Sequence, residues 1–548
     1  MNLFRFLKSE SPETWYVIVA MSLLSGIANG FLLAVINSAA DVVGAEKSLR
    51  FATPYLFILF GISMAIFVLA KRHSMILSTQ VVENMVMRMR VRICDKLRKS
   101  ELMTVERLDR PEVFTKITQD TNVISQSAFV IIEASEDLIM LLCCLIYLAW
   151  ISMAAFLVTI IGAGLANYAY FYHLRSVHQE LKAVAEKETE LFGFLSYILY
   201  GFKELRLSMR KSNSLFGSLT GAAEATRDLK TRVGFMFVTV MMFSQVFVYL
   251  LLAMVVFVLP QYIPTYSGII IKTTSTILFI VGPFNMVVNA SPSLSRADVA
   301  LDNLYTLERT LDESLRTIPV VADQALPLFA DFREIALKDV TFTYTDVRGE
   351  PLFSVGPIDL RVRRGEMVFI VGGNGSGKST LLKLITGLYF PSSGRLTVDG
   401  RRLDASNIQG YREMFTTIFT DFYLFERLIG LEDVPEERVN ALIGEMELAD
   451  KVQFVDGRFS TLNLSTGQRK RLALIAALLE DKDIYVLDEW AADQDQHFRQ
   501  RFYEVILQDL KARGKTILAV THDDRYWGAA DRLIKLELGK IVSDEILH

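Results

Sequence analysis

The sequence predicts an all-α transmembrane domain of six helices, followed by an α/β domain that binds phosphate through a P-loop. Apolar residues make up 51% of the 548 positions and are concentrated in the first 300, a share too high for an ordinary soluble protein. Further along, an apolar strand, a glycine-rich loop and a helical run follow one another over residues 367–385, which is the order that a phosphate-binding loop requires. The net charge of -4 gives no indication of a nucleic-acid partner.

Six membrane spans are expected, because a helix needs about 20 apolar residues to cross about 30 Å of hydrocarbon. Residues 15–40 and 51–70 carry no charge and satisfy this length. The uncharged residues 138–172 are too many for one span and too few for two, so the third span is expected to begin near Phe129. The last two spans are expected at about 233–259 and 269–294.

The distribution of basic residues predicts the orientation of these spans. Eleven Lys or Arg residues lie in 71–127 and ten in 175–232, against two in 41–50 and none in 260–271. Both long loops are therefore expected on the cytoplasmic side. With six spans, the amino terminus and the P-loop domain fall on the same, cytoplasmic side.

The two long loops are expected to continue the spans as helices below the membrane, as the pattern of 81–101 indicates. Candidate helices that dock on the P-loop domain are 109–119 and 200–208; the alternative is that both are ordinary solvated hairpins. The polar residues 313–332, with their two prolines, are typical of a linker. The predicted domains are thus 1–312 and 333–548.

Residues 372–379 read Gly-Gly-Asn-Gly-Ser-Gly-Lys-Ser and match the full G-x-x-x-x-G-K-[ST] pattern. In this motif backbone N–H groups close around phosphates, and the dipole of the following helix favours their charge. Lys378 is expected to reach the outer phosphates, and the Ser379 hydroxyl to ligate Mg²⁺. The predicted nucleotide contacts in this loop are Gly372, Asn374, Gly375, Ser376, Gly377, Lys378, Ser379 and Thr380.

Residues 464–468, Leu-Ser-Thr-Gly-Gln, resemble the LSGGQ signature of the ATP-binding cassette (ABC) family. The resemblance implies an ABC exporter fold that binds and hydrolyses ATP to drive transport. It also implies that ATP is held between the P-loop of one cassette and the signature of a second. The residues that it adds to the ATP-binding set are Ser465, Thr466, Gly467, Gln468 and Asp495.

Two carboxylates follow the apolar strand 484–487. Taken alone, an Asp-Glu pair after a strand is more often a solvated turn. Beside the P-loop and the signature, Asp488 is expected to hold Mg²⁺, and Glu489 to orient or deprotonate the attacking water. The resemblance further assigns the γ-phosphate to His522 and adenine stacking to Tyr344, although aromatic residues of a strand more often pack in the core.

One chain supplies one membrane half and one cassette, so the resemblance implies that a dimer completes each site. The P-loop, both carboxylates, the signature and the histidine are all present. Two copies would therefore give two hydrolytic sites, which favours a homodimer.

The residues after Glu489 depart from the common exporter pattern. The run Trp490-Ala491-Ala492-Asp493-Gln494-Asp495, with 419–425, 498–499, 502–503 and 521–526, resembles the bacterial cyclic-peptide exporter group, whose members export siderophore precursors, lipopeptides such as syringomycin, and a lasso-peptide microcin. This resemblance implies a transporter in the bacterial inner membrane, in contact with lipid, that exports a peptide-like substrate. The alternative is a lipid or multidrug flippase; a regulatory subunit without transport is disfavoured, because every hydrolytic residue is present.

Two features leave alternatives open. Thr420 stands where the family has a Mg²⁺-contacting glutamine, so its hydroxyl or Asp421 takes that place, or the contact is missing.

In the third span, Glu133 and Asp137 share a helical face beside Glu136. These carboxylates either line a water-filled cavity and bind a cationic group of the substrate, or lie in cytoplasmic water.

Overall fold

The computed structural model describes residues 12–44, 49–108, 110–262, 269–315, 329, 331–346 and 350–548. The chain divides into two compact units. The first comprises residues 1–91 and 114–305, and the second comprises residues 92–113 and 306–548. The long helices that begin at Leu49 and Ile270 contribute residues to both units.

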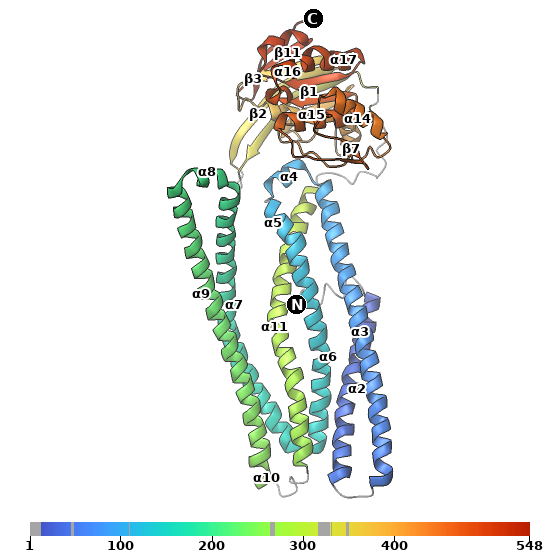
Figure 1. The fold of residues 1–548 in the computed structure, drawn as a ribbon, viewed down its shortest axis with the longest axis vertical. Helices are drawn as coiled ribbons and strands as arrows, with labels where there is room; N and C mark the ends of the chain where they lie inside the picture. Colours follow the sequence, from blue (N-terminus) through green and yellow to red (C-terminus); the bar gives the residue numbers. More distant parts are fainter. Residues whose placement is uncertain are drawn as a thin grey trace. The chain divides into compact units, whose positions relative to one another are not determined.

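Long helices make up the membrane half (Figure 1). Those of more than 30 residues are α2 (Pro12–Gly44), α3 (Leu49–Lys99), α6 (Thr121–Ile151), α7 (Met153–Tyr200), α9 (Met209–Ala253) and α11 (Ile270–Leu315). The shorter elements are α4 (Leu102–Arg107), α5 (Arg110–Thr115), η1 (Lys116–Asp120), α8 (Phe202–Leu207), η2 (Met254–Val258) and α10 (Leu259–Tyr262). Together with the structural likeness reported below, this confirms the predicted six-helix membrane domain.

Four stretches within the described helices are long and apolar enough to cross a membrane by length and composition, namely Tyr16–Ala40, Pro54–Lys99, Gln245–Tyr262 and Ile270–Val288. A shorter apolar stretch lies at Met153–Leu165. Helix α6 carries the acidic residues of the expected third span.

Helices α2 and α6 approach each other closely at two glycines. A Cβ on Gly26 would lie 2.7 Å from Ile139, and one on Gly30 would lie 2.8 Å from Cys143. In the same unit Glu136 is buried, and the Ser22 hydroxyl donates to its Oε1 at 3.3 Å. Glu133 is exposed and Asp137 is half-buried. The buried carboxylate is therefore Glu136, which does not belong to the helical face that Glu133 and Asp137 share.

The cassette contains two main sheets (Figure 1). The antiparallel sheet has the order β2 (Pro351–Arg363), β1 (Glu334–Thr345), β4 (Ser393–Val398), β5 (Arg401–Arg402). The larger sheet has the order β12 (Lys540–Ile546), β11 (Arg532–Glu537), β3 (Met367–Gly372), β10 (Thr516–Val520), β9 (Ile484–Asp488), β6 (Phe415–Ile418). Its strands are parallel except β12, and β3, β9 and β10 are buried almost throughout, which agrees with their nearly continuous apolar sequences.

Helices cover both faces of the larger sheet and bury two apolar cores. They are α12 (Lys378–Ile385), α13 (Ile408–Arg412), α14 (Glu436–Glu445), α15 (Thr466–Glu480), η4 (Trp490–Asp493), α16 (Gln496–Arg501), η5 (Phe502–Ile506), α17 (Leu507–Ala512) and η6 (Asp524–Ala529). A small hairpin is formed by β7 (Phe454–Val455) and β8 (Arg458–Phe459). The arrangement places the carboxyl ends of β3, β9 and β10 at one edge, where ligands bind in open α/β sheets.

Within the second unit, the short helix α4 lies against the cassette. Leu102 and Met103 pack on the core beneath the antiparallel sheet. The docking predicted for 109–119, the next stretch along the chain, stays a prediction, and Asp109 itself lies outside the described residues. The other candidate, 200–208, contains α8; its docking stays a prediction, as do the domain boundaries at 313–332, where most residues lie outside the described ranges.

Candidate nucleotide-binding site

The P-loop joins β3 to α12 through glycines in conformations that other residues adopt only with strain. Gly372, Gly375 and Gly377 all have positive φ. At Gly372 a Cβ would lie 2.2 Å from the Leu536 carbonyl oxygen, so only glycine fits there. Gly377 (φ +99°) directly precedes α12. The loop therefore brings backbone N–H groups to the first turn of the helix.

Lys378 lies inside this loop. Its side chain is 5% exposed, and its Nζ donates to the carbonyl oxygens of Gly372 and Gly373, both at 3.0 Å. The pocket beside it has a volume of about 420 Å³. Its lining consists of Phe353, Asn374, Gly375, Ser376, Gly377, Lys378, Ser379, Thr380 and Glu489. The structure thus brings most of the predicted P-loop contacts and Glu489 to one pocket.

Asp488 ends β9 and is buried, with 1% of its surface exposed. Neither of its carboxylate oxygens has a hydrogen-bond partner of ordinary geometry. Burial raises the pKa of Asp488 above its ordinary value, and the nearby Ser379 hydroxyl partly offsets this shift. A buried carboxylate with unsatisfied oxygens beside a hydroxyl is the oxygen donor set that Mg²⁺ prefers, so these two residues fit the ion.

Glu489 follows Asp488 with a backbone φ of +50°, which is uncommon for a residue with a side chain. Its Oε1 lies 3.0 Å from His522 Nε2 and 3.9 Å from Lys378 Nζ. His522 comes two residues after the end of β10. The P-loop lysine, the glutamate and the histidine thus meet at the carboxyl edge of three neighbouring strands.

The two neighbours of His522 belong to a hydrogen-bond network, whose members Arg499 and Tyr503 were noted in the sequence only as family markers. The Tyr503 hydroxyl contacts Thr521 Oγ1 at 2.6 Å and donates to Asp523 at 3.2 Å. Arg499 donates to the Asp523 carboxylate and to the Gln494 carbonyl, at 3.2 and 3.1 Å. These contacts fix both neighbours of His522.

The signature residues begin helix α15. The Ser465 side chain accepts from the Gln468 backbone N–H, and the Gln468 side chain accepts from Ser465 N–H, a reciprocal capping box. A Cβ on Gly467 would lie 2.4 Å from the Asp493 carbonyl oxygen, which explains the glycine. Ser465 and Thr466 are exposed. No hydrogen bond or ion pair recorded among the described residues joins them to the P-loop of the same chain.

Helix α15 is tied instead to the segment after Glu489. Lys470 Nζ donates to the Glu489 carbonyl oxygen at 2.7 Å and pairs with Asp493 at 2.6 Å. The buried Trp490 donates from Nε1 to the Lys470 carbonyl at 2.9 Å and stacks on Phe502 at 4.3 Å between ring centroids. Trp490 was noted only as a family marker and Lys470 was missed, because no short motif marks such contacts.

Asp495 stabilises the first turn of helix α16. It caps α16 by accepting the Phe498 N–H at 2.9 Å, and it pairs with Arg471 at 2.6 Å. The Phe498 N–H, more than Arg471, lowers the pKa of Asp495 below its ordinary value. The predicted contact of Asp495 with nucleotide stays a prediction.

Two aromatic residues lie close to the P-loop. The Tyr344 hydroxyl is 3.2 Å from Thr380 Oγ1, and its ring packs edge-on against Phe342. Phe353, which sequence reasoning missed, lines the pocket directly. Burial raises the pKa of Asp488, and the backbone of the exposed Thr420 nearby offsets a small part of that rise.

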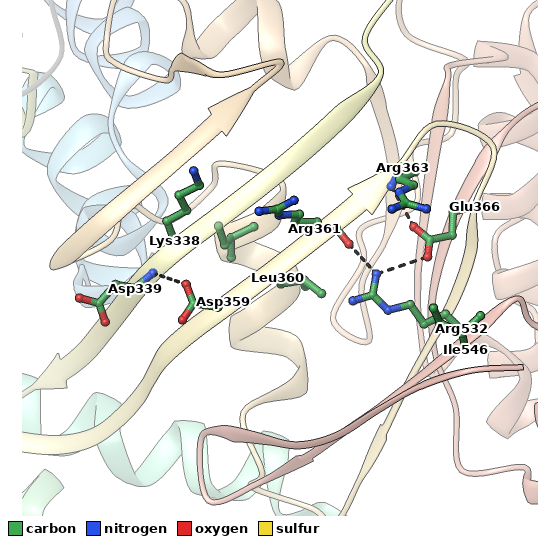
Figure 2. Close-up of a pocket in the computed structure, with 10 residues that line it drawn as sticks. Lys338, Asp339, Asp359, Leu360, Arg361, Arg363, Glu366, Arg532 and Ile546 are labelled. Atoms are coloured by element: carbon green, nitrogen blue, oxygen red, sulfur yellow. Dashed lines mark hydrogen bonds and ion pairs between the residues drawn. The ribbon is translucent and has the colours of Figure 1, made fainter.

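A second pocket, of about 520 Å³, lies away from these residues (Figure 2). Arg532 donates there to the Arg361 carbonyl oxygen at 2.7 Å and pairs with Glu366 at 3.3 Å. Arg532 also pairs with Asp544. Its charge is thereby neutralised within the chain, and the pocket holds none of the predicted site residues.

Comparisons with known proteins agree with this geometry. The family model described as "ABC transporter" matches residues 355–492. "ATP-binding protein SyrD" of Pseudomonas syringae pv. syringae is 32% identical over 99% of this chain and 96% of its own length. An "ATP-dependent lipid A-core flippase" of Cupriavidus metallidurans is 22% identical over 98% of this chain and 92% of its own.

The solved structure of "a bacterial Atm1-family ABC exporter with ATP bound" is similar to this chain with a TM-score of 0.76. The match covers 98% of this chain and 96% of that one, at 19% identity. At that identity the likeness shows the fold of both halves and nothing finer.

Proposed function

Because the chain belongs to the ABC transporter family and is an ATP-hydrolysing exporter, we propose that two copies of it export a peptide or peptide-derived metabolite across the bacterial inner membrane. The cassette lies in the cytoplasm in this proposal, on the side of the basic loops. The observation that carries the hydrolytic part is the Glu489–His522 contact of 3.0 Å beside Lys378. The peptide cargo rests on the resemblance of 490–495 to the cyclic-peptide exporter group and on whole-length similarity to SyrD.

Each residue has a task in this proposal. Lys378 and the P-loop N–H groups bind the outer phosphates, and Ser465 and Gly467 of a second copy close over the γ-phosphate. Glu489 accepts a proton from the attacking water or orients it, and His522 holds both the γ-phosphate and the Glu489 carboxylate. Mg²⁺, held by Asp488 and Ser379 with Thr420 as a further candidate, would neutralise phosphate charge.

Glu489→Gln tests the hydrolytic assignment. The amide cannot act as a base while the phosphate cradle is unchanged, so ATP still binds and hydrolysis falls at least about a hundredfold. The matched control is Glu504→Gln, an exposed carboxylate whose recorded partner is Gln500, and it should hydrolyse ATP like the parent. Near-normal turnover of the Glu489 variant in nanodiscs would remove this residue from catalysis.

The cargo is tested in inverted membrane vesicles. A cationic cyclic lipopeptide should accumulate inside vesicles with the parent chain and ATP, and should not accumulate with Glu489→Gln. The second candidate, lipid A flipping, is favoured by the full-length similarity to the lipid A-core flippase. ATP-dependent movement of lipid A, with no uptake of peptide, would replace the peptide proposal by this one.

A further inference from the structure

Helix α4 carries an exposed carboxylate, Glu106, that contacts the cassette within the second unit. Glu106 Oε1 pairs with Lys383 Nζ of α12 at 2.8 Å, and the Tyr389 hydroxyl donates to Glu106 Oε2. Tyr389 is 2% exposed and stacks on Phe342, with 4.7 Å between ring centroids. Glu106 thus supplies the acceptor for a buried hydroxyl.

The hydrogen bonds continue from Tyr389 to the nucleotide pocket. The Tyr344 hydroxyl donates to the Tyr389 hydroxyl at 3.3 Å. Thr380 Oγ1 lies 3.2 Å from the Tyr344 hydroxyl, and Thr380 lines the P-loop pocket. A continuous run of four side chains therefore connects α4 with the residue after Ser379.

Each hydroxyl has one proton, and this fixes the direction of the run. Tyr389 gives its proton to Glu106, and Tyr344 gives its proton to Tyr389. In the contact between Tyr344 and Thr380, the donor must then be Thr380. The Thr380 hydroxyl therefore donates its proton to Tyr344 and not into the nucleotide pocket. The Glu106 carboxylate, at the other end of the run, strengthens each hydrogen bond.

We propose that Glu106 and Tyr389 are positioning residues that set the donor direction of Thr380, so that docking of α4 and binding of nucleotide phosphate compete for one hydroxyl proton. The proposal rests on the proposed function, in which Thr380 contacts the nucleotide. If Thr380 donates its hydrogen bond to a phosphate oxygen, Tyr344 no longer receives that hydrogen bond. The run of hydrogen bonds that ends at Glu106 on α4 is then weaker. Because coupling is reciprocal, breaking this run at Glu106 or Tyr389 favours nucleotide binding to the same extent.

Tyr389→Phe tests the proposal in the full-length protein in nanodiscs, with Mg²⁺ and ATP present and no transport substrate. Phenylalanine keeps the stack on Phe342 but gives Tyr344 no acceptor at that position, so Tyr344 donates to Thr380 and the Thr380 proton is free for phosphate. The KM for ATP should fall about three- to tenfold, while kcat stays within about twofold. Glu106→Gln keeps a weaker, neutral acceptor and should lower KM less, by about twofold.

The double variant and a matched control make the test specific. Glu106→Gln should add nothing in the Tyr389→Phe background, because the run is already broken. The control is Arg107→Gln: Arg107 also joins α4 to the cassette, through Thr345 Oγ1 at 3.0 Å, but lies outside the run. Its KM should equal that of the parent.

Three outcomes would overturn the proposal: an unchanged or raised KM in Tyr389→Phe, additive effects in the double variant, or an equal fall in KM in Arg107→Gln. The last would mean that any loosening of α4 has the same effect. A parent protein that hydrolyses ATP no faster than Glu489→Gln would instead contradict the proposed function.

Discussion

The carboxylate of Asp488 is buried where the folded chain provides few groups that stabilise its negative charge. Burial raises its pKa, and both oxygens lack partners of ordinary geometry. Its ionised form is therefore disfavoured in the folded protein without the cation, since a buried unsatisfied group costs about 1–3 kcal/mol. The same feature makes the position suitable for Mg²⁺, because the ion supplies the missing charge.

Asp488→Asn is expected to separate stability from activity. The neutral amide removes the buried charge, so the nucleotide-free protein should melt about 2–12 °C higher at pH 7, at about 2–4 °C per kcal/mol. Added Mg²⁺ and ATP should no longer raise its Tm as they do for the parent, and hydrolysis should be lost. Thermal scans with and without Mg²⁺ measure both effects; a lower Tm without ligands would mean that Asp488 stabilises the fold.

At the scale of elements, the site residues marked by contiguous motifs were predictable, and those fixed by distant contacts were not. The P-loop pattern located Lys378 and Ser379, because the loop, strand and helix that place them are continuous in the chain. Phe353 and Lys470 carry no such mark. Each reaches the site because another element brings its backbone there, and the contact of α4 with the cassette was missed for the same reason.

Among the contacts that hold helix α15 to the catalytic segment are two hydrogen bonds, one from Lys470 to the Glu489 carbonyl and one from Trp490 to the Lys470 carbonyl. In the proposed dimer the first turn of α15 serves the partner's ATP, whereas Glu489 serves its own. The hydrogen bonds between α15 and the catalytic segment would therefore couple closure of one ATP site to closure of the other. Glu489 has positive φ, so its side chain depends on the surrounding contacts for its direction.

Trp490→Phe tests this coupling. Phenylalanine can keep the stack on Phe502 but loses the donor to Lys470, which is worth about 0.5–1.5 kcal/mol. We expect kcat for ATP to fall about two- to tenfold with little change in KM, because the phosphate cradle is not touched. The control is Tyr485→Phe, which removes a hydroxyl donor of a neighbouring strand that bonds Ala477 at 3.4 Å. An equal loss of kcat in both variants would indicate general loosening of the core.

At the scale of the whole molecule, a single chain presents its P-loop and its signature without a recorded contact between them among the described residues. Asn374 in the loop and Thr466 at the start of α15 are both exposed, so each is open to a second copy. Ser376, by contrast, is 5% exposed. A disulfide needs Cα atoms within about 7 Å, which makes Asn374 the better reporter of an ATP-dependent sandwich.

The dimer is therefore tested with Asn374→Cys and Thr466→Cys in a Glu489→Gln chain whose own Cys94, Cys143 and Cys144 are replaced. Mild oxidation should give a species of twice the chain mass, several-fold more with Mg²⁺ and ATP than without, because nucleotide brings the two cassettes together. The control pair, Asn374→Cys with Glu445→Cys, uses an exposed position on α14 and should not respond to ATP. Mixing singly substituted chains should give the same crosslink, since the two cysteines belong to different copies. A disulfide within one chain, or one formed equally without nucleotide, would contradict the shared sites and the homodimer that they require.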